Sequence, residues 1–363
     1  MTDTKSADIV DKRFSTDVSL ETPEPLISDI STSAPLADPK QPIEGIHVLR
    51  GVAAVMVVIH HARLSVPGSG AWPGFGASGV DIFFIISGYV MMLTTQGSIT
   101  PGKFLLKRIA RIVPLYWLAT IWTARRDPPD FDLVKDALFI PHHNHAITNW
   151  IAPMLQQGWT LNYEMLFYLI FATSMAVGKT YRHFLILLTL ALMPLLAFLP
   201  GVAAEFYGNS IVWEFGFGIL LFMVASRSTF ERSRLTYLAI MAVGFGLLAL
   251  GYDLWPRALA QGLPALMIVW ASFGACRGWL KSRLVVLIGD ASFAIYLFHW
   301  ASFGAMKPVA RIIHDPDLLM LGHIATAIIA GVIIHLVIEK PMTRLVSRLL
   351  GLRQAPEALP HTA

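Results

Sequence analysis

Long apolar runs separated by short polar segments recur along the whole chain. A helix of about 20 apolar residues is long enough to cross the hydrocarbon core of a bilayer. The pattern therefore predicts an all-α polytopic membrane protein with about ten transmembrane helices around a central cavity. The apolar runs cover residues 46–64, 78–95, 111–124, 161–178, 184–201, 209–226, 236–252, 258–275, 284–304 and 319–338.

The two ends of the chain differ from this apolar body. Residues 1–42 are rich in Ser, Thr, Asp and Pro and contain no apolar run long enough for the core of a signal peptide. Residues 346–363 are few and are broken by Pro356 and Pro360. We therefore expect a disordered cytosolic tail over 1–42, a transmembrane domain over 43–345 and a short cytosolic tail over 346–363.

Composition and charge support a membrane protein and predict its orientation. The chain is 55% apolar and 14% charged, with a mean hydropathy of +0.58, which excludes an ordinary soluble domain. With the amino terminus in the cytoplasm, the inner segments contain 16 Lys and Arg and the outer segments 7. Both termini are thus predicted to be cytoplasmic. The net charge of +4 is spread over separate loops and gives no reason to expect a nucleic-acid partner.

The first apolar run contains an ionisable residue near each end. Arg50 and His61 are eleven positions apart, which places them within about 20° of the same helix face and about 16 Å apart along the axis. A charged group inside a spanning helix costs about 2.5 to 3.5 kcal/mol on insertion scales, so it usually faces the protein interior or a wet cavity. We therefore expect this helix to form one wall of such a cavity.

Asp81 enters the second apolar run at a depth similar to that of His61, within about 5 Å along the membrane normal. A carboxylate beside the imidazole would fix the His61 tautomer and raise its basicity. An alternative remains open at this point, in which Asp81 caps the second helix and His61 is only packed.

A group of basic residues, which includes Arg108 and Arg111, lies at the start of the third apolar run. Such a cluster is typical of positive-inside anchoring. An Arg inside the start of the first helix is not needed for topology, however. Together with Arg50, the two guanidiniums can hold a phosphorylated ligand that enters from the cytosol.

In order and spacing, these residues resemble the acyltransferase family 3 membrane proteins, which O-acylate bacterial surface polysaccharides and related glycans. The resemblance covers about residues 43–345. Two of its motifs, GVDIFFIISG at 79–88 and WTLNYE at 159–164, look most like the exopolysaccharide-production (ExoZ-type) branch. His60 stands where the family often has an aromatic residue, and the spacing from Arg50 favours His61. The motifs are Arg50 followed after ten residues by His61, GVDIFFIISG at 79–88, RIARIVPLYW at 108–117, WTLNYE at 159–164 and GDASFAIYLFHW at 289–300.

The resemblance implies transfer of an acyl group, most commonly acetyl from cytosolic acetyl-CoA, to a glycan hydroxyl, with no metal. A sugar hydroxyl needs a general base, for which His61 is the candidate, and an acyl-His intermediate is a second route. Asp81 would orient His61. Glu164 starts the fourth apolar run at about the depth of His61 and would bind the acceptor or share the acid–base work, with a solvated residue at a helix entrance as the alternative. The cytosolic donor needs cationic groups inside the cell, and the candidates are Arg50, Arg108 and Arg111.

Candidates for acceptor binding lie in two further segments. Trp159 and Tyr163 can stack on a sugar ring, although aromatic belts at the membrane interface are a common cause of such residues. Ser292, Tyr296 and His299 share one face of the ninth helix, which we expect to line the cavity. For His299, hydrogen-bonded packing is the alternative to a direct role.

The segment 141–145 contains three His residues. Their spacing matches no standard zinc pattern, and no nearby Cys or carboxylate completes a ligand set. We interpret the segment as a polar outer loop.

The sequence thus predicts a multi-pass O-acetyltransferase of the bacterial inner membrane, with a glycan or lipid-linked sugar as acceptor and membrane lipid around it. A transporter or flippase for such glycans is the alternative, in which the buried Arg, His and Asp line a permeation path, and a membrane assembly protein is a third class. Release of free CoA, movement of unmodified glycan, or neither would distinguish the three.

Overall fold

The computed structural model describes residues 40–125, 131–144, 150–226, 232–251 and 256–352. Within these ranges the fold is helical throughout, and the pairing of His143 with Ile151 is an isolated β-bridge. The predicted all-α class is therefore confirmed. Nearly all of the expected cytosolic tail, residues 1–39, and the last part of the chain, residues 353–363, lie outside the described residues.

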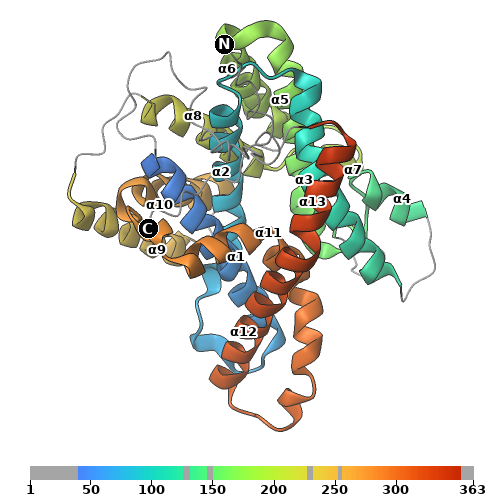
Figure 1. The fold of residues 1–363 in the computed structure, drawn as a ribbon, viewed down its shortest axis with the longest axis vertical. Helices are drawn as coiled ribbons and strands as arrows, with labels where there is room; N and C mark the ends of the chain where they lie inside the picture. The colour runs from blue at the N-terminus through green and yellow to red at the C-terminus, as the bar shows by residue number, and fades with distance from the viewer. Residues whose placement is uncertain (1–39, 126–130, 145–149, 227–231, 252–255, 353–363) are drawn as a thin grey trace, which may run out of the picture.

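The helices follow one another with short connections, several of which are 3-10 turns (Figure 1). In chain order they are α1 (Lys40–Ser65), α2 (Gly79–Thr94), α3 (Pro101–Ala124), α4 (Phe131–Ala137), α5 (Trp159–Ser174), α6 (Gly178–Leu192), α7 (Val202–Tyr207), α8 (Trp213–Ala225), α9 (Arg234–Gly251), α10 (Leu263–Ala275), α11 (Arg283–Phe303), α12 (Pro316–Ile334) and α13 (Lys340–Leu349).

Seven helical stretches within the described residues are long and apolar enough to cross a membrane, and the expected number of ten is not confirmed. The three predicted spans that fall short lie in α3, α5 and α8. The α3 helix has four basic residues in its first half, while α5 and α8 have 16 and 13 residues. The seven stretches are Ile43–Ser65, Gly74–Thr94, Lys179–Phe198, Arg234–Gly251, Ala258–Ala275, Arg283–Met306 and Pro316–Leu349.

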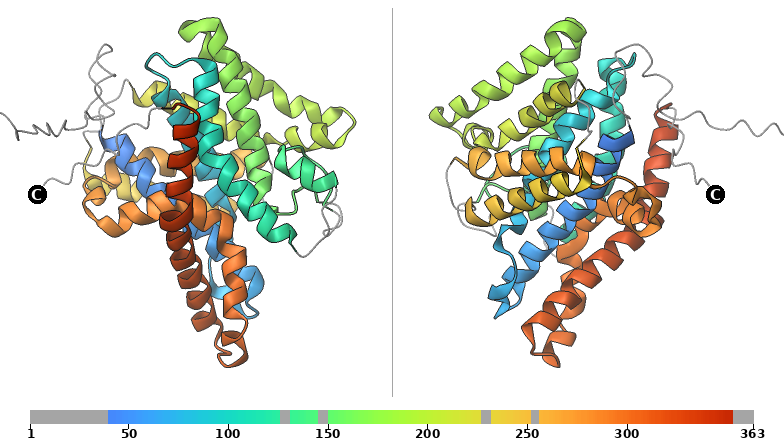
Figure 2. Two further views of the ribbon diagram at one scale, coloured as in Figure 1. Left: turned by 45° about the vertical axis from the view of Figure 1, so that its right-hand side comes forward. Right: turned by 90° about the vertical axis from the view of Figure 1, so that its left-hand side faces the viewer.

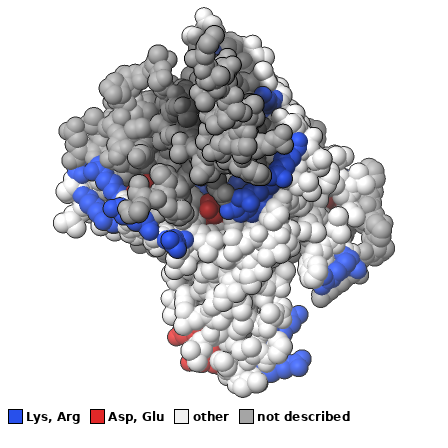
Figure 3. Space-filling view, viewed as in Figure 1, with Lys and Arg blue, Asp and Glu red and all other residues white. Residues whose placement is uncertain are grey.

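The α12 and α13 helices follow each other end to end along a side of the molecule, joined by the π-helical turn His335–Glu339, with a bend between them (Figure 2). Together they have 34 residues, a contour length of about 51 Å, more than the roughly 30 Å of a hydrocarbon core. Basic side chains gather over α13, and charged side chains recur at the tip near residues 304–317 (Figure 3). The surface between them is almost free of charge in this view, as expected of a membrane-facing band.

The α1 helix packs closely against α11 because both have glycine at their crossing. A Cβ atom on Gly289 would lie 2.7 Å from the carbonyl oxygen of His47, and one on Gly51 would lie 3.1 Å from the Cγ2 of Ile288. Small residues at such crossings let two membrane helices approach to backbone contact. The contact aligns the ionisable face of α1 with the motif on α11.

The α2 helix holds α1 on one side and α8 on the other. A Cβ atom on Gly88 would lie 2.1 Å from the carbonyl oxygen of Phe215, so α2 and α8 also touch through their backbones. Next to this crossing, the ring of Phe215 stacks on those of Phe84 and Phe167, with centroids 4.4 and 4.3 Å away. Aromatic packing thus joins α2, α5 and α8.

Candidate active site

A small cavity with a volume of about 130 Å³ lies between α1, α2, α3, α5 and α11. Arg50 enters it from α1, and Arg108 and Arg111 enter it from α3. Two helices that are separated in the sequence by α2 thus bring three guanidinium groups to one place. Such an arrangement can hold an anion through charge-assisted hydrogen bonds.

Glu164 lines the same small cavity. Its Oε1 accepts hydrogen bonds from Ser87, at 3.4 Å, and from the Tyr168 hydroxyl, and it interacts electrostatically with Arg108 and Arg50. Glu164 was expected at about the depth of His61, and the partners that the structure gives it are those of the arginine cavity. A buried carboxylate is stabilised by nearby cations and hydroxyl donors, which a neutral imidazole does not replace.

His61 faces α11, where the buried His299 is its partner. The Nδ1 of His299 lies 2.7 Å from the carbonyl oxygen of Tyr296, so this nitrogen is the protonated one, and the Nε2 of His299 accepts. The Nδ1 of His61 lies 3.1 Å from that Nε2 and 3.0 Å from the carbonyl oxygen of Val57. The Nδ1 of His61 must therefore be the donor, which leaves the lone pair of its Nε2 available as a base.

Asp81 does not form the expected pair with His61. Its Oδ2 lies 2.6 Å from an Nη of Arg257, and Glu214 of α8 lies beside the same pair. The Asp81 side chain is 0% exposed, and a guanidinium compensates a buried carboxylate far better than a neutral imidazole does. The prediction was wrong because a shared depth in the membrane does not determine which side of the helix a residue faces.

A larger cavity, with a volume of about 870 Å³, lies beyond His61 at the other end of α1. Ser65, Gln157 and Trp300 belong to its wall, and the ring of Trp300 lies 5.4 Å from that of His61, measured between centroids. The α1 helix thus runs from the small cavity, at Arg50, to the large cavity, at Ser65. His61 lies one turn before Ser65.

A hydrogen-bonded group separates the two cavities. Thr160 and Tyr296 line the small cavity, and Gln157 lines the large one. The Tyr296 hydroxyl lies 2.8 Å from that of Thr160 and donates to the carbonyl oxygen of Gln157 at 2.9 Å. Ser292 is also in the wall of the small cavity, and Leu297 and Trp300 of α11 line the large one. His299, which was expected to line the cavity with Ser292 and Tyr296, lines neither.

Trp159 and Tyr163, which the sequence suggested for sugar stacking, line neither of these two cavities. Tyr163 is buried, and its hydroxyl donates to the carbonyl oxygen of Phe206. Trp159 packs edge-on against Tyr163, with centroids 5.9 Å apart. Both rings therefore belong to the aromatic packing between α5 and α7.

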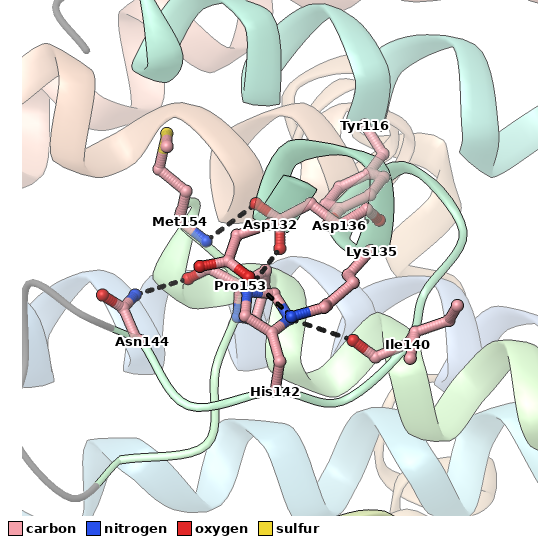
Figure 4. A network of polar contacts seen from close by, with 9 residues as sticks. All are labelled: Tyr116, Asp132, Lys135, Asp136, Ile140, His142, Asn144, Pro153 and Met154. Atoms are coloured by element: carbon pink, nitrogen blue, oxygen red, sulfur yellow. Dashed lines mark hydrogen bonds and ion pairs between the residues drawn. The ribbon is translucent and has the colours of Figure 1, made fainter. Parts of the chain in front are cut away.

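The loop before α5 is braced by a polar network (Figure 4). The carboxylate of Asp136 lies 3.4 Å from the Nε2 of His142 and accepts a hydrogen bond from the backbone N–H of Met154, and Asn144 donates to the carbonyl oxygen of Pro153. His145 lies outside the described residues. The network holds the segment that begins at Met154 and forms part of the wall of the large cavity.

Sequence reasoning missed three residues that the structure places at or near the site. Arg257 directly precedes an apolar run, which was a weak signal for a buried partner of Asp81. Gln157 and Trp122 line the large cavity, and no pattern in the sequence indicated either of them.

Comparisons with known proteins agree with the motifs. The family model described as "Acyltransferase domain" matches residues 43–340. The chain is 30% identical to the "Exopolysaccharide production protein ExoZ" of Rhizobium meliloti (strain 1021), over 74% of this chain and 90% of that protein. It is 25% identical to the "Putative membrane-bound transacylase BcsY" of Komagataeibacter xylinus, over 83% of each chain.

A third relative is the "Putative peptidoglycan O-acetyltransferase YrhL" of Bacillus subtilis (strain 168), which is 26% identical over 83% of this chain and 55% of that protein. No solved structure matches the chain.

Proposed function

We propose, from the premise that this chain belongs to the Acyltransferase domain family, that it moves an acetyl group from cytosolic acetyl-CoA to a hydroxyl of an exopolysaccharide glycan or its lipid-linked precursor. The names of its relatives support both the reaction and the acceptor class, since they include an exopolysaccharide production protein and a putative O-acetyltransferase. The apolar helices and the basic residues at one side support a place in the bacterial inner membrane.

The observation that carries the proposal is the arrangement of charge along α1. At one end, Arg50, Arg108 and Arg111 line one cavity, which suits the phosphates of a CoA donor that arrives from the cytosol. At the other end, the hydrogen bonds of His61 Nδ1 leave its Nε2 free to act as a base. His61 lines neither cavity, and its ring centroid lies 5.4 Å from that of Trp300, which lines the large one. Donor and acceptor would therefore approach the imidazole from opposite sides of the membrane.

The reaction requires one proton acceptor and later one proton donor, and His61 supplies both. Its Nε2 takes the proton of the glycan hydroxyl as the oxygen attacks the thioester carbonyl. The C–O bond forms, the C–S bond breaks, and the imidazolium returns the proton to the departing CoA sulfur. A general base of this kind contributes about 10² to 10⁴-fold to the rate.

The test is release of free CoA by the purified full-length protein in nanodiscs, supplied with acetyl-CoA with and without the extracted glycan. We expect glycan-dependent release and a mass increase of one acetyl group on the glycan. His61→Ala, shown to be folded by its unchanged thermal unfolding, is expected to lose both signals.

Absence of release with any acyl donor would contradict the proposal. Passage of unmodified glycan across the bilayer by the same preparation would then favour the transporter class. Acetylation by the folded His61→Ala protein would keep the reaction class and remove His61 as its base.

A further inference from the structure

The large cavity opens where several outer segments meet. Its wall is formed by the end of α1, the end of α3, the segment before α5, the end of α11 and the start of α12. With a volume of about 870 Å³, it is in the range of sites that enclose a substantial organic ligand, about 300 to 1,000 Å³. Of its wall residues, Trp300 lies next to the imidazole of His61.

The charged groups of this wall have one sign. Among the described residues that line the cavity, the formally charged side chains are Arg125 and Lys307, and no Asp or Glu is present. The carboxylates on the adjacent segment are engaged elsewhere, because Asp315 caps α12 at the N–H of Leu318 and Asp317 accepts from the indole N–H of Trp72. The formal charge of the described side chains that line the cavity is therefore positive.

The aromatic groups of the wall complement this charge. The guanidinium carbon of Arg125 lies 3.4 Å from the ring centroid of Trp122, a cation–π contact that holds both groups at the cavity wall. Trp300 supplies a second indole at the side of His61. Flat apolar faces next to cationic groups suit a sugar ring that is linked to an anionic substituent.

We propose that the large cavity binds the acceptor as an anionic glycan, with a sugar ring against Trp122 or Trp300 and a phosphate or carboxylate held by Arg125 and Lys307. The inference rests on the proposed function, since it names the acceptor class of that same site. The anionic group is either the phosphate of a lipid-linked precursor or the carboxylate of an acidic sugar. In both cases it would fix the position of the hydroxyl relative to His61.

The test measures binding without an acyl donor, so that it does not depend on turnover. The protein in phosphatidylcholine nanodiscs is titrated calorimetrically with a neutral oligosaccharide, with the same oligosaccharide in which one hexose is a uronic acid, and with the neutral oligosaccharide on a prenyl diphosphate. The variants are Arg125→Gln and Lys307→Gln. Arg311→Gln is the matched control, because Arg311 is exposed on the same outer hairpin but does not line the cavity.

We expect at least one anionic ligand to bind about tenfold more tightly than the neutral one, with the preference reduced by rising salt. Each of the two variants should weaken binding of that ligand by about three- to tenfold and leave the neutral ligand unchanged, while Arg311→Gln alters neither. Whether the uronic acid or the prenyl diphosphate is preferred identifies the anionic group.

Equal binding of neutral and anionic ligands, or an equal loss in Arg311→Gln, would overturn the inference. So would loss of the preference in phosphatidylglycerol nanodiscs, which would make the cavity a site for lipid headgroups. If the anionic ligand binds as expected but no acetyl group is transferred, the inference about the cavity stands and the proposed function fails.

Discussion

The Nε2 of His299 lies 3.1 Å from the Nδ1 of His61, and the second nitrogen of His299 is tied to the backbone of its own helix. His299 therefore accepts the proton of His61 Nδ1 and is itself held in one tautomer by the Tyr296 carbonyl. In a histidine, the hydrogen bond that one ring nitrogen makes usually determines which nitrogen carries the proton. In this protein a second imidazole occupies the position that a carboxylate holds in many catalytic pairs.

The first prediction concerns this pair. His299→Ala should lower kcat about tenfold, the loss expected when one orienting hydrogen bond worth about 1.4 kcal/mol disappears, and should leave the KM for acetyl-CoA unchanged. His299→Gln should recover part of the rate, because its amide oxygen can accept from His61 Nδ1. Steady-state kinetics of the purified variants measure both. Equal losses in the Ala and Gln variants would contradict a role for the hydrogen bond that His299 accepts from His61 Nδ1.

The second prediction separates the two neighbouring histidines. His60 packs against the turn Gly74–Ser78, where a Cβ atom on Gly76 would lie 3.0 Å from the Cβ of His60, whereas His61 faces α11. His61→Ala should therefore lose about 10² to 10⁴-fold in kcat, and His60→Ala should stay within about threefold of wild type. Thermal unfolding of both variants controls for folding. The reverse pattern of rates would assign the base to His60.

The grouping of the three arginines was largely predictable from the sequence. Arg50 lies inside an apolar run where topology does not need a charge, and Arg108 and Arg111 lie at the predicted inner end of another run. The cost of burying the Arg50 charge and the positive-inside rule for Arg108 and Arg111 thus predicted that the three arginines lie at the same side of the membrane. The structure places all three in the wall of one cavity.

The partners of Asp81 and Glu164 were less predictable, for a geometric reason. Residue spacing gives the depth of Asp81, Glu164 and His61 in the membrane, but the direction of each side chain depends on how the helices are rotated against one another. Asp81 therefore meets Arg257, and Glu164 meets the arginine cavity. Helix α8 shows a similar limit, because its apolar run predicts a span although only 13 residues of it form the helix.

The third prediction tests the arginine cavity. Arg50→Gln and Arg108→Gln should each raise the KM for acetyl-CoA by about tenfold, because each removes a charge-assisted hydrogen bond to a phosphate. Lys281→Gln is the matched control, since Lys281 is exposed in the segment before α11 and does not line the cavity. Initial rates over a range of acetyl-CoA concentrations provide the measurement. An unchanged KM in both arginine variants would place the donor elsewhere.

The fourth prediction concerns the buried ion pair of Asp81 and Arg257. Asp81→Asn removes the carboxylate that lies 2.6 Å from the Arg257 guanidinium. It should reduce the free energy of unfolding by about 2 to 3 kcal/mol, less than for a fully buried pair, because the Arg257 side chain is 28% exposed. The activity per folded molecule should fall by less than about threefold, since Asp81 does not touch His61. Glu205→Gln, a change at an exposed carboxylate of α7, is the stability control.

A double-mutant cycle with Arg257→Gln checks this explanation. Loss of both partners should be less destabilising than the sum of the single changes, because the interaction between Asp81 and Arg257 is then lost only once. Additive losses would show that the pair itself contributes little. A folded Asp81→Asn protein without activity would return Asp81 to the catalytic group.

The last prediction tests the orientation of the chain in the membrane. Cys276 is the single cysteine, and burial raises the pKa of its thiol to about 11, so it stays protonated and reacts slowly with maleimides at neutral pH. New cysteines at exposed positions can therefore be read against a low background. Arg311→Cys in the hairpin between α11 and α12 should react with a membrane-impermeant maleimide in intact spheroplasts. Lys281→Cys should react only after permeabilisation, and the wild type in neither case. Labelling of Lys281→Cys from outside, with Arg311→Cys protected, would invert the predicted topology and move the arginine cavity to the side of the membrane that has no acetyl-CoA.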